Sequence, residues 1–125
     1  MDNITFSVKK GRFEVAAQIT RMGGDLLVVL SGGIGHIGAI GIAQPRESLS
    51  TPGKTSSTGS VFTYTGHKED VVVKPMAEEI AKRLNRKVVV VAGIHWDRLS
   101  ANEIEMIVGL CNTLKEKIVK EAKAW

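Results

Sequence analysis

The chain has 125 residues, of which 43% are hydrophobic and 24% are charged, and its net charge is +4. These values predict one folded domain over residues 1–125, and they exclude the disordered and fibrous classes. No stretch reaches the roughly 18 uninterrupted apolar residues that a membrane span requires. The Lys and Arg residues are scattered beside acids with few aromatic residues among them, so we expect no nucleic-acid partner.

The first residues, MDNITFSVKKG, lack the apolar centre of a signal peptide, so we expect a cytoplasmic protein with no membrane partner.

The N-terminal part of the chain is predicted to form strands. Residues 4–8 and 12–21 alternate apolar and polar side chains around a KKG turn, which is typical of an antiparallel hairpin. The apolar run 25–32 predicts a strand covered on both faces. Small residues between the isoleucines of 37–43 predict a strand against which another segment packs closely.

The middle of the chain combines a loop signal with a helix signal. Residues 45–60 contain prolines, glycines and many hydroxyl side chains, which indicates a long loop before a strand at 61–65. Apolar residues then recur at helical spacing as far as Asn85. Asp70 is a candidate cap, but Pro75 would then lie beyond the first turn, which favours a regular helix that begins at Pro75.

The last part of the chain predicts one more strand and one more helix. The apolar run 86–95 is typical of a second covered strand. Ser100 and Glu103 have the spacing of a capping box, so the final helix is predicted to start there. Its apolar stripe should face the sheet and consists of Ile104, Ile107, Cys111, Leu114 and Ile118. The single cysteine excludes an internal disulfide and a cysteine-based zinc site, and we expect it to be a buried thiol.

The order of these elements predicts an α+β fold, in which a mainly antiparallel β-sheet is covered by two helices. One face or edge of such a sheet can stay open. In a chain of this size an open sheet surface is suited to a homodimer contact, so we expect a homodimer.

Each of the three histidines lies within two residues after a glycine at a predicted strand end. They are His36, His67 and His95, and acids follow the last two closely. If the sheet brings these strand ends together, the three imidazoles share one pocket. The alternative is that each histidine satisfies a backbone carbonyl and that the glycines only form turns.

The same strand ends carry the residue types of a phosphate site. Glycines let backbone N–H groups approach anionic oxygens, a lysine adds a cation, and imidazoles donate to phosphate or lie beside a planar ring. A phosphorylated planar cofactor would suit this combination. The candidate cofactor-binding residues are Ser31, Gly32, Gly33, Gly35, His36, His67, Lys68, Asp70, His95 and Asp97.

A metal site is a competing interpretation of the same side chains. The candidate ligands, His36, His67, His95 and Asp97, would make the protein a metal-dependent enzyme. Their spacing across three separate turns is not diagnostic, because no two of the histidines share one helical motif. The sequence also lacks a strong nucleophile constellation.

Three segments resemble the LpdD-like family, whose members are described as chaperones for prenylated flavin mononucleotide (FMN). The segments are GGIGHIGAIGIA, GHKED and VVVVAGIHWD, in that order and followed by a capped terminal helix. The resemblance extends from about Gly23 to Leu114. Family members often carry aspartate where this chain has Glu69, a change that keeps the acidic character.

The resemblance implies a fold similar to that of the proteasome assembly chaperones, which commonly dimerise. It also implies that the protein is not an enzyme but binds prenylated FMN, or FMN itself, and delivers it to a UbiD-like decarboxylase. The matching positions are His36 with its glycine neighbours, His67 with Lys68 and Asp70, and His95 with Asp97. A flavin-independent assembly chaperone that works through an open sheet face is the remaining alternative.

Overall fold

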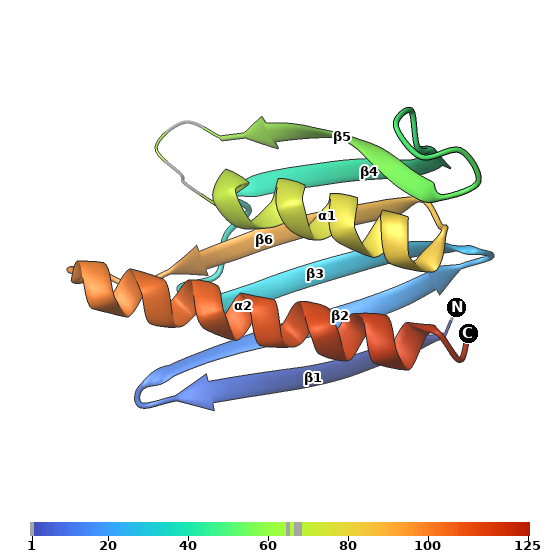
Figure 1. The fold of residues 1–125 in the computed structure, drawn as a ribbon. Helices are drawn as coiled ribbons and strands as arrows, with labels where there is room; N and C mark the ends of the chain where they lie inside the picture. The colour runs from blue at the N-terminus through green and yellow to red at the C-terminus, as the bar shows by residue number, and fades with distance from the viewer. Residues whose placement is uncertain (1, 65, 67–68) are drawn as a thin grey trace.

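The fold is one six-stranded sheet with two helices (Figure 1). The computed structural model describes residues 2–64, 66 and 69–125. Its strands lie in the order β1-β2-β3-β6-β4-β5, and every pair is antiparallel except the parallel pair β3 and β6. The elements are β1 (Asn3–Lys10), β2 (Phe13–Met22), β3 (Asp25–Gly33), β4 (Ala39–Glu47), β5 (Thr55–Thr63), α1 (Asp70–Leu84), β6 (Val88–His95) and α2 (Ala101–Ala122). The predicted α+β architecture is confirmed.

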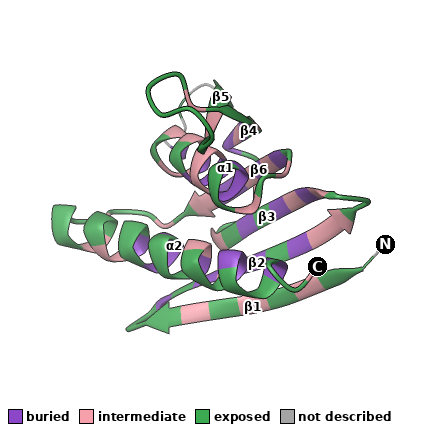
Figure 2. Ribbon diagram, turned by 45° about the vertical axis from the view of Figure 1, so that its right-hand side comes forward, coloured by how far each residue is buried: buried purple, intermediate pink, exposed green. Residues whose placement is uncertain are grey.

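Both helices lie on the same face of the sheet. Helix α1 packs on β4, β5 and β6, and α2 packs on β1 and β2 (Figure 1). The buried side chains lie between the helices and the sheet, as the purple segments of Figure 2 show. Alternate residues of the central strands face this core, among them Val28, Leu30, Val88 and Val90.

The other face of the sheet is not covered by any helix of the described residues. The prediction that the apolar runs of β3 and β6 are covered on both faces is therefore wrong for the single chain. Val29 keeps 36% of its surface exposed, and Leu27, Val89 and Val91 are only partly buried. The continuous apolar run predicts two apolar faces, but it does not determine what covers the second one.

The predicted long loop over residues 45–60 is also wrong. Most of this segment belongs to an extended hairpin, because β4 continues to Glu47 and β5 starts at Thr55. Pro45 is tolerated within β4 since it pairs with Ser57, beyond the last residue of β4 that pairs with β6. There β4 has a neighbour on one side only, which is where a strand can accept proline.

The two helices follow the sequence predictions with two differences. Helix α1 begins at Asp70, so the predicted start at Pro75 is wrong and this proline lies within the helix. Helix α2 has the predicted capping box, in which Ser100 and Glu103 each accept a hydrogen bond from the other's backbone N–H. Of its predicted core stripe, Ile104 is the exception, because half of its surface is exposed. No helix among the described residues is long and apolar enough to cross a bilayer.

Candidate functional site

The predicted site lies at one end of the sheet, where β3 and β6 stop and β4 begins. In the parallel pairing of β3 with β6, Gly33 stands opposite His95 at the last position of both strands. The connection from Ile34 to Gly38 then returns to the sheet, where the Gly38 N–H donates to the Ala92 carbonyl at 2.9 Å. Glu69, the N-cap residue of α1, contacts this connection, so three segments far apart in sequence meet there.

His36 is held by hydrogen bonds at both ring nitrogens. Its Nδ1 lies 3.0 Å from the Ile34 carbonyl oxygen, and its Nε2 lies 2.8 Å from Oε1 of Glu69. Glu69 precedes α1 as its N-cap residue, but its side chain makes no cap bond and turns to the connection instead. The same Oε1 accepts a bond of 3.4 Å from the Ile94 N–H. One carboxylate thus links α1, the connection and β6.

The proton arrangement of this pair follows from its partners. A carbonyl oxygen can only accept, so Nδ1 of His36 carries a hydrogen. The short contact from Nε2 to Glu69 then needs a second proton, which makes His36 an imidazolium when Glu69 is ionised. The Ile34 carbonyl and the Glu69 carboxylate raise the pKa of His36, while its desolvation opposes them. The histidine charge compensates a carboxylate that is only 8% exposed.

His95 completes the described part of the cluster. The centroids of the His36 and His95 rings are 6.1 Å apart, and the two planes are nearly perpendicular at 89°. Nε2 of His95 lies 3.0 Å from Oδ1 of Asp97, and both side chains are open to solvent. The partly buried pair of His36 and Glu69 therefore adjoins an exposed pair of side chains, His95 and Asp97.

Glycines make this close approach possible. A Cβ atom on Gly93 would lie 1.7 Å from the His36 carbonyl oxygen, and one on Gly38 would lie 2.2 Å from Oε2 of Glu69. At Gly33, where φ is +67°, a side chain would meet the His95 carbonyl oxygen at 2.0 Å. The surroundings of Gly35 are open, with no heavy atom within 4 Å of a built Cβ. Most of these glycines thus serve the packing of the site, while the surroundings of Gly35 stay open.

Comparison with known proteins identifies the family. The family described as "Prenylated flavin chaperone LpdD-like domain" matches residues 9–123, which is nearly the whole chain. The chain belongs to this LpdD-like family. A curated relative, Protein LpdD of Lactiplantibacillus plantarum, is 25% identical over 121 residues, covering 96% of this chain and 85% of the relative. The match is longer than the segment that carried the sequence resemblance.

A solved structure confirms the expected fold of this LpdD-like chain. It is the "Crystal Structure of a Novel Chaperone Complex for Yeast 20S Proteasome Assembly", with a TM-score of 0.53. The match covers 92% of this chain and 99% of the solved chain, at 9% sequence identity. This likeness concerns the fold alone.

The ten predicted site residues of the LpdD-like chain fall into three groups. His36, His95 and Asp97 lie together at the strand ends, and Asp70 is the first residue of α1. Ser31, Gly32 and Gly33 form the end of β3, followed by Gly35 in the connection. Two of the predicted residues, His67 and Lys68, lie outside the described residues.

Sequence reasoning missed Glu69 as a site residue. Its side chain is buried, contacts His36 and leaves Oε2 without a hydrogen-bond partner among the described residues. The acid beside His67 was visible in the sequence, but nothing there indicates that it reaches back to a residue 33 positions earlier. The one sequence feature connected with this contact is Gly38, because a side chain at this position would collide with the Glu69 carboxylate.

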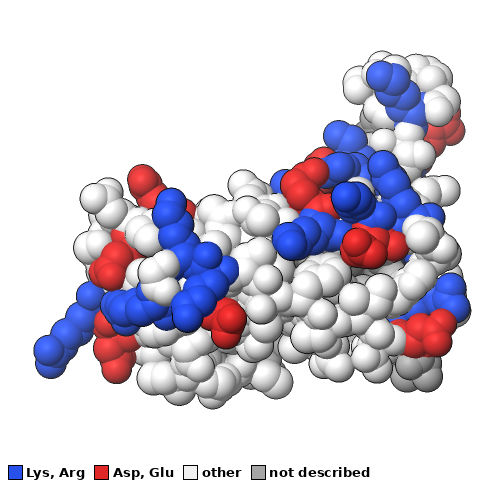
Figure 3. All heavy atoms as spheres, turned by 90° about the horizontal axis from the view of Figure 1, so that it is seen from below, with Lys and Arg blue, Asp and Glu red and all other residues white. Residues whose placement is uncertain are grey.

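A metal site and a cysteine nucleophile are the two other chemistries, and the predicted metal ligand His67 lies outside the described residues. No group of three or more His, Cys, Asp or Glu residues in the described ranges could hold a metal ion. Cys111 is buried, and burial raises the pKa of its thiol to about 12, so it is not a nucleophile at neutral pH. On the face shown in Figure 3, Lys and Arg gather with Asp and Glu in mixed groups beside uncharged surface.

Proposed function

We propose that this LpdD-like chain is a carrier without enzymatic activity, which binds prenylated FMN and delivers it to a UbiD-like decarboxylase. The observation that carries the proposal is the pair of imidazoles at the strand ends, with centroids 6.1 Å apart beside the open surroundings of Gly35. The description of the family supports the choice of cargo. We propose that the protein is located in the cytoplasm and binds both prenylated FMN and the decarboxylase in that compartment.

The proposed binding roles follow from the chemistry of each group. Exposed His95 and Asp97 offer a donor and an acceptor to the polar edge of a flavin ring. We propose His67 and Asp70 as further contacts of the ring. Backbone N–H groups of the segment 31–35 are suited to the phosphate together with Lys68, except that of Ile34, which donates to the His95 carbonyl. His36 is fixed by its two hydrogen bonds and thereby shapes the site. FMN itself shares the phosphate and most of the ring, so it should bind more weakly.

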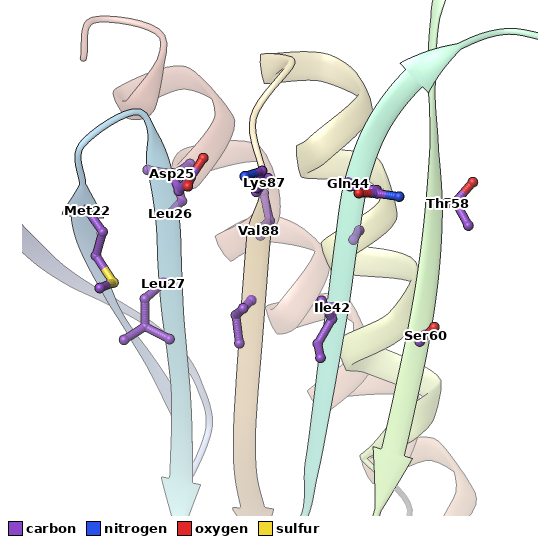
Figure 4. Close-up of a pocket in the computed structure, with 12 residues that line it drawn as sticks. Met22, Asp25, Leu26, Leu27, Ile42, Gln44, Thr58, Ser60, Lys87 and Val88 are labelled. Atoms are coloured by element: carbon purple, nitrogen blue, oxygen red, sulfur yellow. The ribbon is translucent and has the colours of Figure 1, made fainter.

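We further propose that the protein acts as a homodimer through the open face of its sheet. Two rows of apolar residues cross three strands there, β3, β6 and β4. Leu27, Val89 and Ile42 are register neighbours in one row, and Val29, Val91 and Ile40 form the next row. Figure 4 shows Leu27 and Ile42 on the strand face turned away from the helices. The cleft between them has a volume of about 500 Å³. A surface with these apolar rows is typical of a contact between copies.

Titration with FMN and prenylated FMN, followed by fluorescence and mass spectrometry, tests the carrier function. We expect saturable binding of prenylated FMN, and at least about a tenfold loss of affinity when His36, His67 and His95 are all changed to alanine, because several hydrogen bonds are removed. Lys120→Ala at the opposite end of α2 is the control and should bind as wild type does. The triple variant must retain the wild-type circular dichroism spectrum.

The same experiment separates the competing functions. Wild-type affinity in the folded triple variant would refute the site. Stoichiometric zinc or iron that survives dialysis would favour the metal-dependent enzyme. Pull-down of a partner protein that is affected neither by added flavin nor by the histidine substitutions would indicate the flavin-independent assembly chaperone. Activation of an apo-decarboxylase by the loaded carrier, and not by the loaded triple variant, tests delivery.

A further inference from the structure

A second cavity adjoins the histidine cluster on the helix side of the sheet. It lies between the N-terminal turns of α1 and α2 and has a volume of about 460 Å³. This value falls within the roughly 300–1,000 Å³ that small-molecule sites occupy. The aliphatic and aromatic residues of its lining are Val71, Val72, Ile94, Trp96, Leu99, Ile104, Ile107 and Val108. Its chemistry is therefore mainly apolar.

The exposure of this lining is unusual for an apolar surface. Val71 is 64% exposed, Ile104 is 50% exposed and Val108 is 38% exposed, although all three are aliphatic and lie beside one another in the same cavity. Ile104 continues the core stripe of α2, yet it faces the cavity instead of the sheet. A contiguous apolar surface that the described residues leave exposed is typical of a binding site.

The cavity has one polar end, and that end is the histidine cluster. His95 and Glu69 belong to the lining, and Glu69 is the residue that bonds His36. Trp96 provides a fixed aromatic wall, because its ring packs edge-on against Phe13 with centroids 5.0 Å apart. A ligand in contact with the imidazoles can thus extend directly into an apolar space.

We propose that this cavity, named here the interhelix cleft, receives the isoprenoid-derived ring that distinguishes prenylated FMN from FMN. The inference rests on the proposed carrier function and adds the element that selects the cargo. The added ring is a compact saturated hydrocarbon group, which matches the aliphatic lining. The phosphate and the polar edge of the flavin stay at the strand ends, where the glycines, the imidazoles and Asp97 lie.

The affinity ratio between prenylated FMN and FMN measures this contribution. Burying each methylene strengthens binding about fourfold at 25 °C, so several buried carbons should give the wild type at least about a tenfold preference for the prenylated ligand. Val108→Trp fills the cleft and Ile104→Ala trims its wall, and both residues are exposed enough for the fold to tolerate the change. We expect V108W to abolish most of the preference and I104A to reduce it about fourfold or more, with FMN affinity changed little.

Lys117→Trp is the matched control, since it introduces the same side chain at an exposed position of α2 outside the cleft. It should keep the wild-type ratio, measured by equilibrium dialysis with mass-spectrometric quantification of each flavin. If prenylated FMN binds and both cleft variants keep the wild-type ratio, the cleft assignment is overturned while the carrier function stands. If the wild type binds neither flavin, the carrier function itself is wrong.

Discussion

At the scale of single residues, the pair of His36 and Glu69 determines the character of the site. A carboxylate that is 8% exposed is costly to bury without compensation, and His36 supplies the compensating charge and hydrogen bond. Because the second nitrogen of His36 is committed to the Ile34 carbonyl, the ring cannot rotate freely. The pair therefore fixes the connection after β3 in the position that exposes His95 to a ligand.

This pair should make stability depend on pH near neutrality. Folding raises the pKa of His36 above its ordinary value of 6.5, so the folded chain binds the proton more tightly than the unfolded chain. The stabilisation is complete below about pH 6.5 and is lost as the pH rises through the raised pKa. NMR titration of the His36 ring should give a pKa above 6.5 in wild type and a lower one in Glu69→Gln.

Urea unfolding supplies the thermodynamic counterpart. The free energy of unfolding of wild type relative to His36→Gln should be largest at about pH 6 and should decline towards about pH 8.5. A difference that stays constant over this range would contradict the raised pKa. The comparison cancels the titration of His67 and His95, which both chains retain.

At the scale of elements, the connection between β3 and β4 depends on glycines that pack against other backbone. We expect Gly93→Ala to destabilise the fold by about 2 kcal/mol or more, since inserting a methyl group into a close-packed site costs roughly 1–3 kcal/mol. Its Cβ would lie 1.7 Å from the His36 carbonyl oxygen, so the connection must shift. Thermal and urea unfolding measure the loss, and the NMR signal of the His36 ring should move with it.

Gly24→Ala is the control for this substitution. Gly24 lies in the turn between β2 and β3, and a Cβ there would meet no heavy atom within 4 Å. Its effect should stay within about 0.5 kcal/mol, as for ordinary surface positions. Equal losses of unfolding free energy in the two variants would contradict a close contact between Gly93 and the His36 backbone.

Element types were predictable wherever periodicity was strong. The hairpin of β1 and β2, the stripe from Met76 to Ala81 and the capping box of α2 follow directly from the residue pattern. The β4–β5 hairpin was not predictable, because its serines, threonines and Pro45 are typical of a loop. The strand tolerates Pro45 only because β4 extends there past Val88, the first residue of β6, and has a neighbour on one side. The partner of Glu69 was equally hidden, since it depends on a tertiary contact.

At the scale of the whole molecule, the sequence predicts the layers but not their coverage. The apolar runs of β3 and β6 reveal that both faces of the central sheet are hydrophobic. The two helices cover one face, and no helix of the described residues lies on the other. The interhelix cleft escaped prediction for a similar reason, because Ile104 has the spacing of a core residue, whereas in the structure it lines the cleft and keeps half of its surface exposed.

The proposed homodimer can be tested by placing a charge on the open sheet face. Ile42 is 54% exposed in the single chain and stands beside Val89, the central residue of its apolar row. Because an unpaired lysine is costly to bury in an apolar interface, Ile42→Lys should convert the dimer into a folded monomer. Leu49→Lys is the matched control, since Leu49 is 91% exposed in the segment between β4 and β5 and contributes to neither row. Analytical ultracentrifugation should give a dimer for wild type and L49K and a monomer for I42K. A monomeric wild type, or an I42K variant that remains dimeric, would show that the copies do not associate through this face.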